Sequence, residues 1–180
     1  GIEFSGADLE VLADCKVAAC KFKLGRKGID SLGALDWSQP DAGDRFVEGF
    51  RSEALAYVEG YQKKGNAGLI LYADKSRPDP LGPTVESLVR QFEVFQRRAP
   101  GLSNYLLSYP TGRRPGMSDA IVWQMADFGY RPTLVIDHIV VDRETEVAGA
   151  TALAAVKTIY ANHYLAGRVQ MGAVLDGEVA

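Results

Sequence analysis

The stretch from residue 132 to the end of the chain constrains the fold most, because it holds the most concentrated β-type sequence. Residues 133–141 alternate and are apolar on both faces, as in a strand that is covered on both sides. One face carries Leu134, Ile136, His138 and Val140, and the other carries Val135, Asp137, Ile139 and Val141. We therefore predict a strand over 133–141, with further strands over 119–126 and 168–175.

The run 151–165 is compatible with two structures. Its alanines favour a helix, in which one face would carry Leu153, Val156, Ile159, Tyr160 and His163. Its alternation favours a strand, which would place Val156, Thr158, Tyr160, Asn162 and Tyr164 opposite Ala155, Lys157, Ile159, Ala161 and His163. Periodicity alone does not decide between the two.

Most of the chain before residue 119 is predicted to form helices that pack on these strands. Ser5 and Asp8 resemble a capping box at the start of a helix over 6–13. The clearest helix has Ser38 as its predicted N-cap and ends before Gly65. Its apolar face repeats every three or four residues and consists of Phe46, Val47, Phe50, Ala54, Tyr57, Val58 and Tyr61. We also predict an extended segment over 15–24, a loop with one helical turn over 25–37, a strand over 67–74, and helices over 84–97 and within 101–110.

Length and charge narrow the class of protein. The pattern predicts one α+β domain over residues 1–180, with helices packed on an antiparallel sheet and a core large enough to fold without a metal. The net charge of −3 argues against a nucleic-acid partner, which would need a basic face. No apolar run reaches the roughly 20 residues of a membrane-spanning helix. Residues 1–4 lack the features of a signal peptide.

The two cysteines, Cys15 and Cys20, are separated by four residues, which is not the spacing of a zinc or thioredoxin motif. One interpretation is that they are unrelated small residues. The other is a short disulfide loop, which would indicate an oxidising compartment such as the periplasm. We predict the disulfide. A metal site is the weakest interpretation, because both histidines lie more than 100 residues away.

The histidines His138 and His163 are the candidates for chemistry. Asp137 cannot pair with His138, because neighbouring residues of a strand point to opposite faces. If the two histidines met across neighbouring strands, they and a carboxylate could form a metal or general-base site. The more common role of such a histidine is a hydrogen-bonded core residue, so we predict no catalytic residue, metal or cofactor. Asp137 needs a partner if it is buried, and the candidates are Lys157 or an arginine.

Several segments together resemble a family of uncharacterised bacterial exported proteins. They are DLEVLADCKVAACKFKL, IDSLGALDWSQPDAGDRF, YQKKGNAGLILYAD, LSNYLLSYP, GMSDAIVWQMADFG, PTLVIDHIVV and KTIYANHYLAGRVQMGAVL, and they cover nearly the whole chain in order. The family's pattern is similar to START-like, helix-grip lipid-binding domains, in which a curved antiparallel sheet wraps a long helix around an apolar cavity. The resemblance implies a periplasmic or otherwise exported protein and a strand over 151–165. It also implies that this chain is a piece of a longer protein or a shorter relative.

The sequence leaves three functional hypotheses. The first is a non-catalytic module that binds a lipid or another apolar small molecule in an internal cavity. Its candidate ligand-binding residues are Trp123, His138, Tyr160, His163 and Tyr164. The second is an envelope-associated interaction or structural module without a ligand. The third is a hydrolase or lyase that uses His138 or His163 with Asp137.

Overall fold

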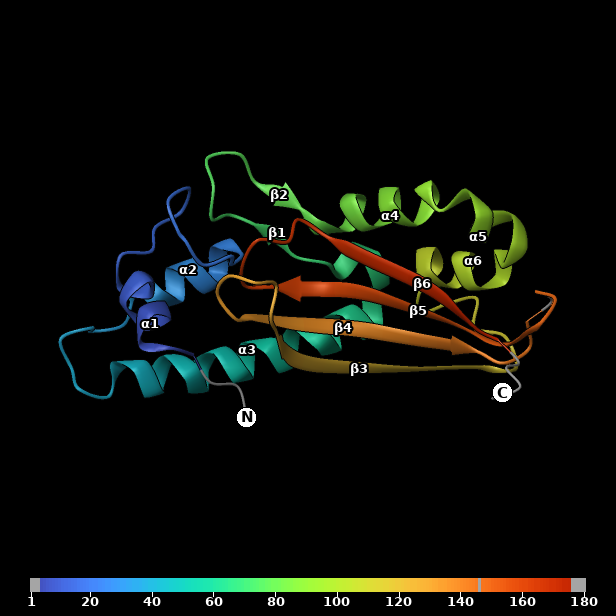
Figure 1. Ribbon diagram of the computed structural model, residues 1–180. Helices are drawn as coiled ribbons and strands as arrows, with labels where there is room; N and C mark the ends of the chain where they lie inside the picture. Colours follow the sequence, from blue (N-terminus) through green and yellow to red (C-terminus); the bar gives the residue numbers. More distant parts are fainter. Residues whose placement is uncertain (1–3, 146, 176–180) are drawn as a thin grey trace, which may run out of the picture.

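The computed structural model describes residues 4–145 and 147–175, and its centre is a four-stranded antiparallel sheet in the order β3-β4-β5-β6 (Figure 1). The strands are β3 (Met117–Ala126), β4 (Thr133–Asp142), β5 (Ala150–Ala161) and β6 (Arg168–Leu175). Gly129 and Gly149 have positive φ angles at the first two connections, which favours glycine there. The strands predicted over 119–126, 133–141 and 168–175 are confirmed, and the ambiguous run 151–165 forms a strand rather than a helix.

Helices lie near both ends of the sheet. The elements are α1 (Gly6–Ala13), α2 (Arg26–Gly33), α3 (Ala42–Lys64), the 3-10 helix η1 (Gly65–Gly68), α4 (Leu81–Gln91), α5 (Glu93–Arg98) and α6 (Pro100–Ser108), together with the short paired strands β1 (Leu71–Tyr72) and β2 (Asp79–Pro80). Figure 1 shows α1 and α2 toward one end of the molecule, α4, α5 and α6 toward the other, and α3 running lengthwise between them. The chain is therefore α+β, as predicted.

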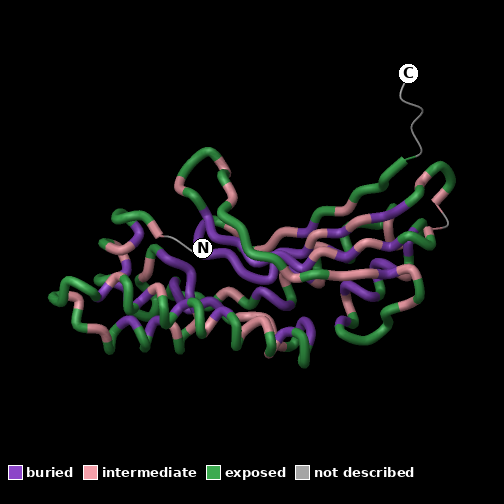
Figure 2. Tube along the Cα trace, turned by 90° about the horizontal axis from the view of Figure 1, so that it is seen from below, coloured by how far each residue is buried: buried purple, intermediate pink, exposed green. Residues whose placement is uncertain are grey.

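The core lies between the helices and one face of the sheet. On β4 this face carries the buried residues Leu134, Ile136, His138 and Val140, and α3 contributes Phe46, Phe50, Ala54 and Tyr61. In Figure 2 the buried positions run through the interior, and the exposed ones gather on loops and outer helical turns. The opposite face of the sheet is less completely covered. Its half-buried residues include Ile139, Val141, Ala154 and Val156.

Two helix ends follow the signals in the sequence. Ser5 and Asp8 form the predicted capping box of α1, in which each side chain bonds to the backbone N–H of the other residue. Gly65 ends α3 with a φ of 59°. An added Cβ at Gly65 would lie 1.6 Å from the carbonyl oxygen of Tyr109, so only glycine fits there. Ser38, however, is not the N-cap of α3. That residue is Asp41, and Ser38 bonds instead to the carboxylate of Asp36.

Other predicted elements differ in length or type. The segment 25–37 contains all eight residues of α2 rather than one turn, and the strand predicted over 67–74 is reduced to Leu71–Tyr72. The helix predicted over 84–97 is divided at Phe92, whose ψ of 64° is not helical, into α4 and α5. Residues 15–24 form turns and isolated bridges rather than one extended segment, although Phe22 is fully buried.

A disulfide joins Cys15 to Cys20, as predicted. The loop that it closes is held against residues 73–74, because the N–H of Ala18 donates to the carbonyl oxygen of Ala73 (2.8 Å) and that of Cys20 to the carbonyl oxygen of Asp74 (3.0 Å). Within residues 4–145 and 147–175, none of the helices combines the length and the apolar character that crossing a bilayer requires.

Candidate functional site

A cavity of about 430 Å³ lies between α2, α3, β1 and the helix-covered face of the sheet. Its size falls in the range of pockets that hold small organic molecules, roughly 300–1,000 Å³. Most of its lining is apolar and consists of Leu24, Phe50, Ala54, Tyr57, Ile70, Leu71, Ile136 and Tyr160. The strand β4 and the long helix α3 both contribute lining residues, so the cavity depends on packing between distant parts of the chain.

The two tyrosines in this lining contribute aromatic rings rather than free hydroxyls. The hydroxyl of Tyr57 donates to the carbonyl oxygen of Ile159 and accepts a hydrogen bond from the N–H of Ile70 (3.3 Å). The hydroxyl of Tyr160 donates to the carbonyl oxygen of Lys23 (2.9 Å). Burial raises the pKa of both hydroxyls far above their usual value, so both stay protonated. A ligand therefore meets mainly carbon surface in this part of the cavity.

Charged residues join the lining on the side of α2. Arg26 and Lys27 lie in the first turn of this helix, and Glu53 faces them from α3. The carboxylate of Glu53 accepts from the hydroxyl of Ser31 (3.2 Å) and lies 3.8 Å from the ammonium of Lys27. The cavity thus combines an apolar interior with a few polar groups, which is the usual composition of a small-molecule site.

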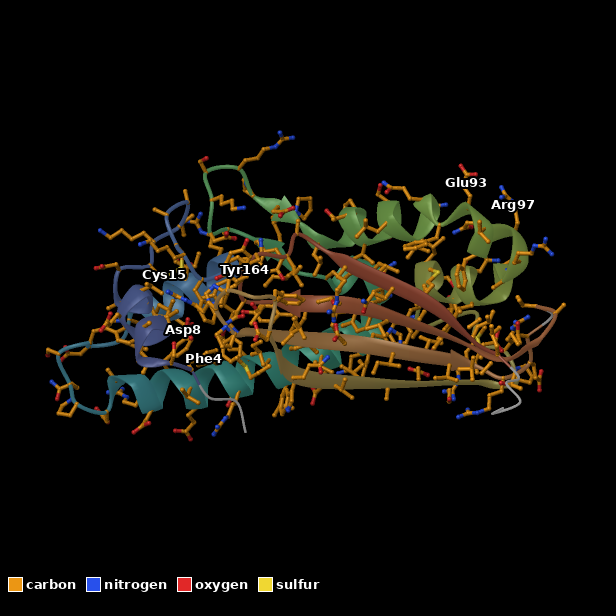
Figure 3. The ribbon with its side chains drawn as sticks, viewed as in Figure 1. Phe4, Asp8, Cys15, Glu93, Arg97 and Tyr164 are labelled. Atoms are coloured by element: carbon orange, nitrogen blue, oxygen red, sulfur yellow. A yellow bond between two sulfur atoms is a disulfide. The ribbon has the colours of Figure 1, made fainter. Side chains whose placement is uncertain are left out.

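The structure places the five predicted ligand-binding residues in different surroundings. Tyr160 lines the cavity, whereas the other four are not among its lining residues. Trp123 is 44% exposed on β3, directly across from the lining residue Ile136. Tyr164 is 56% exposed and lies against Tyr130, with 5.7 Å between the ring centroids. Figure 3 shows Tyr164 close to the N-terminal helix and its Asp8.

His138 is fully buried in a polar cluster beneath α3 and α6. Its Nδ1 lies 2.8 Å from the hydroxyl of Tyr61, and its Nε2 lies 3.2 Å from a carboxylate oxygen of Asp119. Burial and the nearby charge of Lys157 lower the pKa of His138 to about 4, although Asp119 opposes this shift. The neutral ring therefore accepts from Tyr61 and donates to Asp119. All of its polar atoms have partners within the protein, which is the role of a core histidine.

Lys157 lies beside His138 on the neighbouring strand and is also fully buried. Its ammonium donates to the side-chain oxygen of Asn66 and to the carbonyl oxygen of Leu106, each at 3.0 Å. It also lies 5.1 Å from the ring centroid of Tyr61. Burial lowers the pKa of Lys157 to about 7. No carboxylate pairs with it among the described ion pairs.

Asp137 faces the other side of the sheet and pairs with an arginine, one of the two predicted partners. Arg168 approaches its carboxylate to 2.7 Å, Thr158 to 2.6 Å and Gln124 to 3.1 Å. Lys157, the other predicted partner, lies on the helix-covered face. Asp137 and His138 point in opposite directions, so the geometry gives His138 no acid–base partner in Asp137.

His163 belongs to a separate cluster near the N-terminal helix. Its Nε2 lies 3.2 Å from the carboxylate of Asp8, which also binds Arg131 at 3.1 Å, and its Nδ1 lies 3.2 Å from the carbonyl oxygen of Lys21. Burial lowers the pKa of His163, whereas the hydrogen bond to Asp8 raises it. The two histidines therefore have different sets of partners. Among the described residues, no three histidine, cysteine or carboxylate side chains are placed to hold a metal ion.

Sequence reasoning missed most of the cavity. The pattern of α3 placed Phe50, Ala54 and Tyr57 on one face, but it did not distinguish a cavity wall from a filled core. The segment 24–28 was read as the end of an extended stretch and the beginning of a loop, and no local signal marks it as a wall. Comparison of the chain with family models, with curated proteins and with solved structures finds no match.

Proposed function

We propose that this protein is a non-catalytic binding module that holds an apolar small molecule or a lipid in the cavity between α2, α3 and the sheet. The observation that carries the proposal is the cavity itself, about 430 Å³ in volume and lined mainly by carbon surface. The hydroxyls of Tyr57 and Tyr160 are bonded to backbone groups, which favours an apolar ligand over one that needs many hydrogen bonds.

The setting of the cavity supports an exported protein with helix-grip character. A long helix, α3, lies along an antiparallel sheet and shares the cavity with it, which is the arrangement that the resemblance to START-like domains implies. The disulfide between Cys15 and Cys20 supports an oxidising compartment such as the periplasm.

The test measures the binding of a hydrophobic fluorescent probe, anilinonaphthalene sulfonate, to the purified protein. Ala54 is a buried lining residue on α3, and Ala54→Leu adds volume to the cavity wall. We expect this variant to bind the probe about tenfold more weakly, which corresponds to about 1.4 kcal/mol. Native mass spectrometry followed by organic extraction should also reveal a co-purifying apolar molecule.

The matched control is Leu55→Phe. Leu55 is the next residue of α3, is 54% exposed and does not line the cavity, so this variant should bind the probe as the wild type does. Circular dichroism establishes that both variants are folded. Equal loss of probe binding in both variants, or no loss in Ala54→Leu, would overturn the proposal.

A second candidate function is an envelope-associated module that binds a protein partner and no small ligand. It is favoured by the exposed apolar side chains of the edge strand β3, which are Val122, Trp123 and Met125. An edge strand with exposed apolar residues is a template for pairing with another chain. Light scattering coupled to size-exclusion chromatography tests this candidate. Self-association that is abolished by Trp123→Ser would support it. A monomer at all concentrations would argue against self-pairing.

A further inference from the structure

A second, smaller cavity of about 130 Å³ adjoins the first one along the contact between α2 and α3. The two cavities share the lining residues Leu24, Gly28, Phe50 and Glu53. Because these residues face both spaces, they form the wall between them. The apolar residues Leu32, Leu35 and Phe46 line the smaller cavity and not the larger one.

The cavities lie end to end along α3. Phe46 and Gly49 line only the smaller one, Phe50 and Glu53 line both, and Tyr57 lines only the larger one. The rise of an α-helix places Phe46 and Tyr57 about 16 Å apart along the axis. Together the two cavities therefore form an elongated space rather than a rounded one.

Gly28 lines both cavities. A Cβ added at this glycine would lie 3.3 Å from Cδ2 of Leu24 and 3.7 Å from a carboxylate oxygen of Glu53. The position therefore faces the side chains that separate the two spaces, and a side chain added there would displace Leu24. Gly28 does not have a positive φ angle, so backbone conformation does not require glycine at this position.

Two cations, Arg26 and Lys27, line the larger cavity, and their side chains are 74% and 85% exposed. Arg26 lies 3.9 Å from Asp30 and Lys27 lies 3.8 Å from Glu53. Exposed ion pairs of this kind are weak, so both cations can also bind an anionic head group.

Beyond the shared wall, the smaller cavity offers the apolar side chains of Leu32, Leu35 and Phe46, and its lining is completed by Ser31, Arg45 and Gly49. A ligand with a carboxylate at one end and an unbranched chain at the other matches the cations of the larger cavity and the apolar side chains of Phe50, Leu32 and Phe46 beyond them.

We propose that the ligand is an unbranched, single-chain carboxylic acid that lies lengthwise along α3. Its carboxylate is placed beside Arg26 and Lys27, and its chain passes Phe50 and Gly28 into the smaller cavity. This inference rests on the proposed binding function and adds the shape and chemistry of the ligand. An extended chain advances about 1.2 Å per bond, so the combined space takes a chain of about a dozen carbons.

The experiment compares octanoate and laurate as displacers of anilinonaphthalene sulfonate from the folded protein. In the wild type we expect laurate to bind at least about tenfold more tightly than octanoate, because only the longer chain reaches the second cavity. Gly28→Leu places a side chain at the shared wall. It should weaken laurate by about tenfold and change octanoate by less than about threefold.

Two further variants make the result decisive. Gly49 lines the smaller cavity, and a Cβ added there has no atom within 4 Å, so Gly49→Leu fills that cavity from α3 and should reproduce the selective loss of laurate. Gly33 also has open space around it but lines neither cavity, and Gly33→Leu should bind both acids as the wild type does. If Gly28→Leu does not fold, Gly49→Leu alone carries the test.

The outcomes separate this inference from the proposed function. If Ala54→Leu weakens probe binding but the wild type binds octanoate and laurate equally, the elongated ligand is overturned and a binding cavity remains. The same conclusion follows if Gly49→Leu loses both acids equally. Absence of probe binding to the wild type would overturn both. Selective loss of laurate in Gly49→Leu, with Gly33→Leu unchanged, would establish the lengthwise position of the chain.

Discussion

At the scale of single residues, Lys157 departs most from what the sequence indicates. The alternation of β5 placed Lys157 and Tyr160 on opposite faces, but both point toward the helices. His138 pairs with Lys157 and the nearby Ile136 pairs with Tyr160, while the pairing register shifts between these positions. This shift makes Ile159 an extra residue, as in a β-bulge, and reverses the faces that follow. A bulge leaves no clear mark in the residue pattern, so it could not be predicted.

The burial of Lys157 makes stability depend on pH. Its pKa is about 7 in the folded protein and near the ordinary 10.5 in the unfolded chain. Between these values the unfolded state binds more protons, so stability should rise as the pH rises from about 7 to about 10. Below about pH 7 both states are protonated, and folding carries the full cost of the buried charge. Lys157→Met should remove this rise, which amounts to several kcal/mol. Urea unfolding at about pH 6, 8 and 9 measures it.

The control for Lys157→Met is Lys63→Met, which removes an exposed lysine from the last turn of α3. This variant should keep the pH dependence of the wild type. A wild type and a Lys157→Met variant whose free energies of unfolding run parallel across the whole range would contradict the assignment of the pH effect to Lys157.

At the scale of elements, predictions succeeded where the signal is local. The capping box of α1, the glycine at the end of α3 and the alternation of β4 each lie within a few neighbouring residues. The predictions failed where long-range contacts decide the structure. The helix α2 has no side-chain cap, and β1 exists through its pairing with β2, so neither leaves a strong local pattern.

The disulfide loop supports a prediction at the same scale. Under the chain-entropy model, a bridge between Cys15 and Cys20 closes a very short loop, so its removal by Cys15→Ala/Cys20→Ala should destabilise the protein by about 2 kcal/mol. The loop also holds residues 73–74 through two backbone hydrogen bonds, which are donated by the amide groups of residues 18 and 20. These amide protons should exchange faster in the variant. Urea unfolding and hydrogen exchange measure the two effects.

A reduced wild type is the control for the disulfide variant. Its free energy of unfolding in the presence of a reductant should match that of Cys15→Ala/Cys20→Ala. If the oxidised protein, the reduced protein and the variant all unfold at the same urea concentration, the bridge contributes nothing to stability and the prediction is wrong.

At the scale of the whole molecule, the class of fold could be predicted but the candidate site could not. The order of helical and β-type segments indicated helices on an antiparallel sheet, because the periodicities of residues 46–61 and 133–141 are strong, although that of 151–165 left helix and strand open. The cavity is formed by Leu24, Phe50, Ile70 and Ile136, which come from four distant segments. Their proximity follows from tertiary packing alone. Tyr160 is predicted as a ligand-binding residue because it is aromatic and was expected near the possible polar anchors His138 and His163, and no pattern marked the other walls.

A polar network crosses all four strands of the sheet on the side away from α3. Gln124 on β3, Thr158 on β5 and Arg168 on β6 all bond to the carboxylate of Asp137 on β4. Asp137 is fully buried, and Arg168 is the group that balances its charge. The network therefore links the sheet from one edge to the other.

Removal of Arg168 tests how far the stability of the sheet depends on this network. Arg168→Met leaves a buried carboxylate without a counter-charge, so we expect a loss of about 3 kcal/mol in the free energy of unfolding, measured by urea denaturation. The control is Arg97→Met, because the ion pair of Arg97 with Glu93 lies on the surface of α5 (Figure 3) and both side chains are more than two-thirds exposed. Exposed pairs of this kind contribute about 0.5 kcal/mol or less.

The double variant Asp137→Asn/Arg168→Met should recover part of the loss, since it removes the uncompensated charge. Equal effects of Arg168→Met and Arg97→Met would mean that the carboxylate of Asp137 finds adequate partners in Thr158 and Gln124 alone, and that the sheet does not depend on the charge pair.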